Sequence, residues 1–118
     1  MESIRDYGQY KQENWKMNEK TYGNENYVPS MRLSGVCDSL GVTGKKFGDG
    51  ECAVTCKISE NHLNAGGVAH GGLHSTMLDS ALGGAPVSLI KKEEWCATAQ
   101  LDISFLNAAY VGDVLVAE

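Results

Sequence analysis

One long helical pattern lies between two runs of alternating residues, and this order limits the folds open to the chain. Residues 51–59 alternate between apolar and polar, as a half-buried strand does. From Gly72 the apolar residues recur instead at helical spacing. Residues 98–106 alternate again, and a further strand begins at Val114. One helix inserted into a mainly antiparallel sheet predicts an α+β fold.

The helical stretch is rich in small residues. Gly83 and Gly84 leave its second half thin, so we expect it to lie close against the sheet. Pro86 should kink or break the helix, because proline removes a backbone donor and clashes with the preceding turn. Lys91 and Lys92 stand where a helix end favours cations. The predicted buried face comprises Leu73, Met77, Ala81 and Ala85, widened by Leu78 and Leu82.

Each predicted strand has an expected inner and outer face. Residues 41–47 should form a strand that turns at residues 48–50 into the strand 51–59, because an Asp-Gly pair between such runs is typical of a hairpin. In the strand 51–59 the inner residues are Cys52, Val54, Cys56 and Ile58, and the outer ones are Glu51, Ala53, Thr55 and Lys57. In the strand 98–106 the inner residues are Leu101, Ile103 and Phe105, and the outer ones are Thr98, Gln100, Asp102 and Ser104.

The length of 118 residues favours a single domain. We assign residues 1–27 to a polar extension, in which the spacing of Ile4, Tyr7, Lys11 and Trp15 is that of a short amphipathic helix. Residues 28–118 form the main domain, and Pro29 and Ser30 could open a short helix through about Asp38. The chain stops within a strand pattern at Glu118, so we expect the domain to lack its last strands.

Charge and composition exclude several classes of function. The net charge is −5, and no lysine or arginine cluster is longer than a pair, which argues against nucleic acid as a partner. No apolar run has membrane-spanning length, and the N-terminal stretch lacks the features of a secretory or mitochondrial leader. We therefore expect a cytoplasmic protein, with an organelle left open. Its cysteines should be reduced, buried thiols: Cys37, Cys52, Cys56 and Cys96.

A loop rich in glycine leads into the helix and holds the candidate reactive groups. Gly71 and Gly72 open the helix, whose first N–H groups have no partner within it, so a carbonyl oxygen could sit there and gain stabilisation as an oxyanion. The side-chain amide of Asn64 could bind substrate or water. Asp79, about two turns further on, could act as a general base or nucleophile. Together these groups indicate acyl transfer to water.

Each of these residues also has a plainer interpretation. Asp79 could complement the helix dipole, and the glycine pair could serve close packing. His70 is better suited to holding the loop through hydrogen bonds than to transferring protons, and Thr98 could simply be a good strand former. A metal site is disfavoured, because the zinc-protease glutamate is absent between His70 and His74. His62 is read as a loop residue.

The pattern Asn64-x5-His70-Gly71-Gly72-x6-Asp79, together with the stretch "LDISFLNAA", resembles the hotdog-fold acyl-CoA thioesterases of the phenylacetyl-CoA and 4-hydroxybenzoyl-CoA thioesterase group. The resemblance implies a curved antiparallel sheet wrapped around the long helix and a site shared across a homodimer. One subunit would supply Asn64, His70 and the polarising Gly71 N–H, with Gly72 beside them, and the partner would supply Asp79. Thr98 matches a position that orients water in the family.

The function implied by the resemblance is hydrolysis of an acyl-CoA to a carboxylic acid and coenzyme A, as in fatty acid metabolism. The coenzyme would lie with its pantetheine arm in a groove between subunits, and no metal or tightly held cofactor is expected. A non-catalytic hotdog module that binds acyl-CoA or a protein is the alternative. Acyl length and the choice between dimer and tetramer stay open, and Leu73, Met77 and Leu78 could line an acyl pocket or belong to the core.

Overall fold

The computed structural model describes residues 33, 35–91 and 93–118. The helices and strands of these described residues belong to a compact unit formed by Pro29–Ile90 and Trp95–Glu118. Within the described residues, no helix is both long and apolar enough to cross a membrane. In chain order the elements are the helix α2 (Gly35–Leu40), the strands β1 (Thr43–Gly48) and β2 (Glu51–Lys57), the short 3-10 helix η1 (Glu60–His62), the helix α3 (Gly71–Val87) and the strand β3 (Val114–Ala117).

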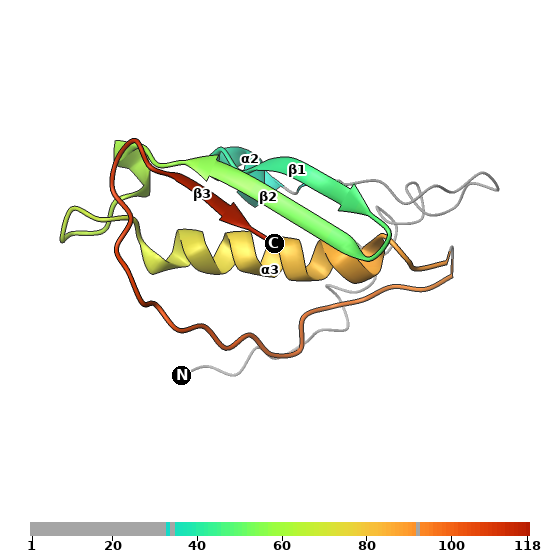
Figure 1. Ribbon diagram of the computed structural model, residues 1–118. Helices are drawn as coiled ribbons and strands as arrows, with labels where there is room; N and C mark the ends of the chain where they lie inside the picture. The colour runs from blue at the N-terminus through green and yellow to red at the C-terminus, as the bar shows by residue number, and fades with distance from the viewer. Residues whose placement is uncertain (1–32, 34, 92) are drawn as a thin grey trace. The chain divides into compact units, whose positions relative to one another are not determined.

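The three strands form one antiparallel sheet in the order β1-β2-β3 (Figure 1). Between β1 and β2, the residues Asp49 and Gly50 both have positive φ, at 52° and 81°. Two such residues in succession make the hairpin turn whose twist matches the strands, which is why an Asp-Gly pair is favoured there. This confirms the predicted hairpin, and β1 begins two residues later than the sequence suggested.

Helix α3 packs against the central strand β2 through its small residues. Leu73, Met77 and Ala81 are buried, as predicted. A Cβ atom on Gly84 would lie only 2.3 Å from Cys52 Sγ, so the glycine allows an approach that no side chain would permit. The prediction that small residues let this helix lie close to the sheet is therefore confirmed at Gly84, whereas a Cβ on Gly83 would meet nothing within 4 Å.

The end of α3 agrees with the prediction at Pro86 and differs from it elsewhere. The helix ends at Val87, one residue after Pro86, and the chain turns out of it through hydrogen bonds to Pro86 O, so the predicted break is confirmed. No basic residue occupies the last turn, since Lys91 lies beyond it. Leu82 was placed on the buried face, yet it is 60% exposed, because the apolar stripe is narrower than expected.

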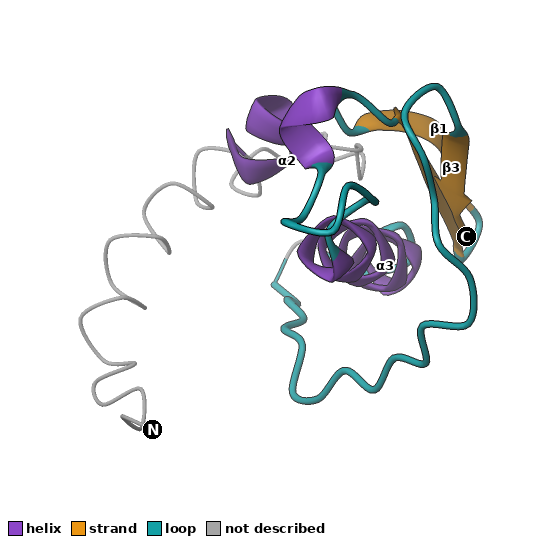
Figure 2. Cartoon of the chain, turned by 90° about the vertical axis from the view of Figure 1, so that its left-hand side faces the viewer, coloured by secondary structure: helices purple, strands orange, loops and turns teal. Residues whose placement is uncertain are grey.

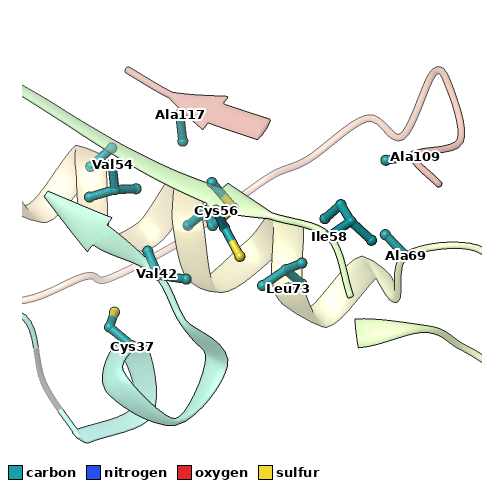
Figure 3. Close-up of a cluster of buried hydrophobic side chains, with 11 residues drawn as sticks. Cys37, Val42, Val54, Cys56, Ile58, Ala69, Leu73, Ala109 and Ala117 are labelled. Atoms are coloured by element: carbon teal, nitrogen blue, oxygen red, sulfur yellow. The ribbon is translucent and has the colours of Figure 1, made fainter. Parts of the chain in front are cut away.

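The core lies between β2 and α3 (Figure 3). Burial raises the pKa of the Cys52 and Cys56 thiols, so both stay protonated and act as small apolar groups. All cysteines are free thiols, as predicted, although Cys96 is exposed rather than buried. Leu78, Leu40 and Leu115 cover the cluster from its edges. Its buried members are Cys37, Val42, Val54, Cys56, Ile58, Ala69, Leu73, Met77, Ala81, Ala109 and Ala117.

The predicted strand at residues 98–106 is wrong as an element, although the chain there is extended. No strand among the described residues pairs with this stretch, and it runs along α3 on the side away from the sheet (Figure 2). A strand requires a neighbour for its backbone hydrogen bonds. The alternation survives in part, since Leu101 and Ile103 are half-buried between exposed neighbours, but Phe105 is 57% exposed.

Smaller differences concern individual positions. Ala53 is buried, although it was assigned to the outer face of its strand. β2 ends at Lys57, two residues early, and η1 occupies the start of the predicted loop. The short helix expected up to Asp38 is present as α2, ending at Leu40. The predicted helix near the N-terminus, together with Pro29, Ser30 and Lys92, lies outside the described residues.

Candidate active site

The loop before α3 is closed on itself by Asn64. The backbone of Asn64 donates to Val68 O at 2.8 Å and accepts from Gly67 N at 3.0 Å. Its side-chain Oδ1 accepts from Gly66 N at 2.8 Å and from Val68 N at 3.3 Å. Both backbone donors thus point at one oxygen, which leaves the Nδ2 amide as the group of Asn64 that can serve a substrate. Asn64 is exposed, so this donor is accessible.

His70 caps the first turn of α3. Its Nδ1 accepts a hydrogen bond from Gly72 N at 2.8 Å, which satisfies one of the helix's unpartnered donors. Because Nδ1 is the acceptor, a neutral ring carries its proton on Nε2. A Cβ on Gly72 would lie 2.8 Å from this same Nδ1. The structure therefore gives His70 the holding role expected of it and explains why Gly72 has no side chain.

Gly71 presents its N–H at the start of α3. As the first residue of the helix it has no intrahelical acceptor, and none of the described residues accepts from it elsewhere. A Cβ on Gly71 would lie 3.2 Å from Phe105 Cε1. Gly71 thus combines a free backbone donor with a close contact to an aromatic ring.

Asp79 and Thr98 meet on the outer side of α3. Thr98 Oγ1 donates to Asp79 Oδ1 at 2.5 Å, and Asp79 is half-buried. A hydrogen bond to a carboxylate is charge-assisted and fixes its orientation. The two residues are 19 positions apart, so the extended stretch 98–106 brings them together. Asp79 Oδ2 is left to act on another group.

The described chain thus holds two groups of candidate residues rather than one. Asn64, His70 and Gly71 lie at the start of α3, whereas Asp79 and Thr98 lie further along it. The helical rise of 1.5 Å per residue places the Cα atoms of Gly71 and Asp79 about 12 Å apart along the axis. A base or nucleophile must lie within about 3–3.5 Å of its target or be linked to it by one water.

A buried histidine, His62, holds the residue before Gly71 in place through its backbone. Its structural role was not predicted from the sequence. Ser59 N donates to His62 Nδ1 at 2.9 Å, so the other ring nitrogen carries the proton and donates to Leu40 O at 2.6 Å. His62 O in turn accepts from His70 N at 2.8 Å. The side chain is 8% exposed, so its bonds replace those of water. A signal for it was the Ser three residues earlier, a spacing typical of a helix start.

Replacing His62 with phenylalanine should destabilise the fold by about 1–2 kcal/mol, because Ser59 N–H loses its partner and Leu40 C=O keeps only the weak donor Cys56 Sγ, at 3.5 Å. We expect a lower urea midpoint with an unchanged slope. Asn61→Ala, a change at the exposed neighbouring position, is the control and should leave the midpoint in place. Equal midpoints for the two variants would show that the His62 bonds contribute nothing.

The described residues include no group of three or more histidine, cysteine or acidic side chains placed to hold a metal. His74 instead donates from Nδ1 to His70 O at 3.2 Å and meets Phe105 edge to face. Leu73 and Met77, considered for an acyl pocket, are members of the core.

Comparison with known proteins finds relatives of this chain among thioesterases and esterases. Residues 66–118 match the family model described as Thioesterase superfamily. A Pseudomonas aeruginosa protein whose name describes it as a candidate esterase is 36% identical over 92 residues, which are 77% of this chain and 69% of that protein.

Solved structures share the fold. A conserved protein of Pseudomonas aeruginosa has a TM-score of 0.66 at 25% identity, covering 71% of this chain and 66% of that one. The Escherichia coli PaaI protein of the phenylacetic acid degradation operon has a TM-score of 0.64 at 22% identity. The match covers 89% of this chain and 67% of that one. A Streptococcus pneumoniae protein described as a hypothetical thioesterase with coenzyme A has a TM-score of 0.53 at 33% identity. The match covers 64% of this chain and 56% of that one. The chain thus spans about two thirds of these relatives or less, and its fold is the hotdog fold expected.

Proposed function

The chain belongs to the thioesterase superfamily, and we propose that it hydrolyses an acyl-CoA to a carboxylic acid and coenzyme A. The observation that carries the proposal is the hydrogen bond from Thr98 to Asp79, which orients a carboxylate on the helix that begins with a free Gly71 N–H. An oriented base and a backbone oxyanion donor are the two elements that acyl transfer to water requires.

In the proposed reaction, water adds to the carbonyl carbon of the thioester while Asp79 takes a proton from it. The carbonyl oxygen becomes an oxyanion that accepts from the Gly71 N–H. Collapse of this intermediate breaks the carbon–sulfur bond, and the departing thiolate takes up a proton to give the free thiol. Direct attack by the Asp79 carboxylate, followed by hydrolysis of the anhydride, uses the same groups.

We further propose that two copies of the chain form each site. Within one copy, Gly71 and Asp79 are about 12 Å apart along α3, too far for both to reach the same thioester carbonyl through direct contact. A second copy whose Asp79 faces the first copy's Gly71 removes this difficulty. In the same arrangement the Asn64 Nδ2 donor would hold the substrate carbonyl or the attacking water.

Coenzyme A as the thiol is supported by the Streptococcus pneumoniae protein, whose title names coenzyme A and whose fold is shared. The decisive experiment is to follow the thioester absorbance of short, medium, long and aromatic acyl-CoAs with the 118-residue chain. Hydrolysis of any of them supports the proposal. A folded chain that binds acyl-CoA without hydrolysing it would establish the alternative, a non-catalytic binding module.

Asn64→Asp separates the structural role of Asn64 from its catalytic one. The new carboxylate can still accept from Gly66 N and Val68 N, so the loop should keep its shape. It cannot donate, so we expect kcat/KM to fall by about 10²-fold, the usual loss for one donor at a reacting carbonyl. Asn61→Asp adds the same charge three residues earlier and should change kcat/KM little. If both variants lose activity equally, charge near the loop rather than the Nδ2 donor is responsible.

A further inference from the structure

Phe105 lies against the start of α3 while remaining open to solvent. Three of its ring atoms, Cε1, Cζ and Cδ1, lie 3.2, 3.4 and 3.7 Å from the position that a Cβ on Gly71 would take. The ring is nevertheless 57% exposed. A large apolar side chain that contacts its neighbours on one side only leaves most of its surface available to another molecule.

The orientation of the Phe105 ring is held by a residue in the first turn of α3. His74 meets Phe105 edge to face, with ring centroids 6.0 Å apart and an angle of 84° between planes. Such T-shaped pairs are favourable, because the positive edge of one ring meets the negative face of the other. His74 is held in turn by its bond to His70 O, directly before Gly71. The ring is therefore a fixed wall beside the Gly71 N–H.

The distances bring this wall within reach of a bound acyl group. The Cβ position and the amide nitrogen of Gly71 are both bonded to Cα and are about 2.5 Å apart, so the ring comes within about 6 Å of the nitrogen. An oxygen accepting from that N–H sits about 2.9 Å from the nitrogen, and the carbonyl carbon lies about 1.2 Å beyond it. These lengths are short enough for the next atom of the acyl group to contact the ring.

We propose that Phe105 is a specificity-determining residue that disfavours branching at the carbon next to the thioester carbonyl. This inference rests on the proposed function and adds the choice of substrate to it. A linear acyl group places one methylene against the ring, whereas a branched group places a second carbon where the ring stands. The cost of such a clash acts on substrate and transition state alike, so it appears in kcat/KM.

The test compares butanoyl-CoA with 2-methylpropanoyl-CoA, which have the same number of carbons and differ only in branching. The unmodified chain should prefer the linear substrate. Phe105→Ala should lower the ratio of the two kcat/KM values by about tenfold or more, the scale on which one carbon is discriminated in an apolar site. Leu106→Ala is the matched control, because Leu106 is 84% exposed on the same segment and should leave the ratio unchanged.

Each outcome decides a separate point. An unchanged ratio in Phe105→Ala, with both substrates still hydrolysed, overturns the role of Phe105 and leaves the proposed function standing. No hydrolysis of these substrates or of the medium, long and aromatic acyl-CoAs by the folded unmodified chain overturns the proposed function and the inference with it. If Phe105→Ala hydrolyses the substrates too slowly for rates to be measured, binding replaces kinetics. The dissociation constants of linear and branched S-alkyl thioether analogues of the two substrates are then compared in the variant and the unmodified chain. Their ratio must fall in the variant as predicted for kcat/KM. Equal changes in the Leu106→Ala control would also refute the proposal.

Discussion

Asp79→Asn should lower kcat/KM for acyl-CoA hydrolysis by about 10³-fold, within the range that a positioned base supplies. The substitution keeps the size of the side chain and an oxygen that can accept from Thr98 Oγ1, so the hydrogen bond that joins the helix to residues 98–106 can persist. What is lost is the negative charge and the ability to take a proton from water. Initial rates of thioester absorbance loss at several substrate concentrations give kcat and KM separately.

The control for this variant is Asp102→Asn. Asp102 is exposed on the same extended segment as Thr98, and its substitution removes the same charge without touching the site. We expect its kcat/KM to stay within about twofold of the unmodified chain, since an exposed charge is well screened. Retention of most activity by Asp79→Asn would refute the assignment of the base. A similar fall in both variants would point to net charge instead.

The parts of the fold that local chemistry determines were predictable from the sequence. The Asp49-Gly50 pair supplies two residues that tolerate positive φ, so the hairpin follows from two positions alone. The buried face of α3 follows from helical spacing, because Leu73, Met77 and Ala81 recur on one side of any helix at these positions. Such signals depend on neighbours in sequence, and the structure confirms them.

The features that were mispredicted depend on partners distant in sequence. Residues 98–106 have the alternation of a strand, but none of the strands that the structure describes lies beside them, so the pattern alone could not establish the element. Ala53 alternates outward yet is buried, and burial is decided by what covers a face. His62 looked like a loop residue because its partner Leu40 lies 22 positions away.

The candidate site shows the same division. The cap by His70 was predicted, whereas the turn closed by Asn64 was not, although its partners lie within four positions. No distance between Asp79 and Thr98 follows from the sequence, and only the fold brings them into contact. Phe105 was assigned to an inner face, and its place over Gly71 emerged only from the path of the segment after α3. Whether these residues catalyse stays a prediction.

Two adjacent glycines in α3 should respond in opposite ways to the same substitution. Alanine is favoured over glycine in a helix by about 1 kcal/mol. At Gly83 nothing lies within 4 Å of the new Cβ, so Gly83→Ala should stabilise the fold by up to about that amount. At Gly84 the new Cβ would lie 2.3 Å from Cys52 Sγ and 3.0 Å from Cys52 Cβ. Overpacking of this kind costs about 1–3 kcal/mol, so Gly84→Ala should destabilise.

The expected difference between the two variants is about 1–3 kcal/mol, which is the cost of overpacking at Gly84 alone. Urea unfolding of both variants measures it, since the helix propensity term is common to them and cancels. Cys52→Ala removes the sulfur and should relieve part of the clash, so a double-mutant cycle of Gly84→Ala with Cys52→Ala should show a favourable coupling of about 1 kcal/mol or more. If Gly84→Ala is as stable as Gly83→Ala, the helix does not lie on β2 as closely as described. The site would then be affected as well, because α3 carries both Gly71 and Asp79.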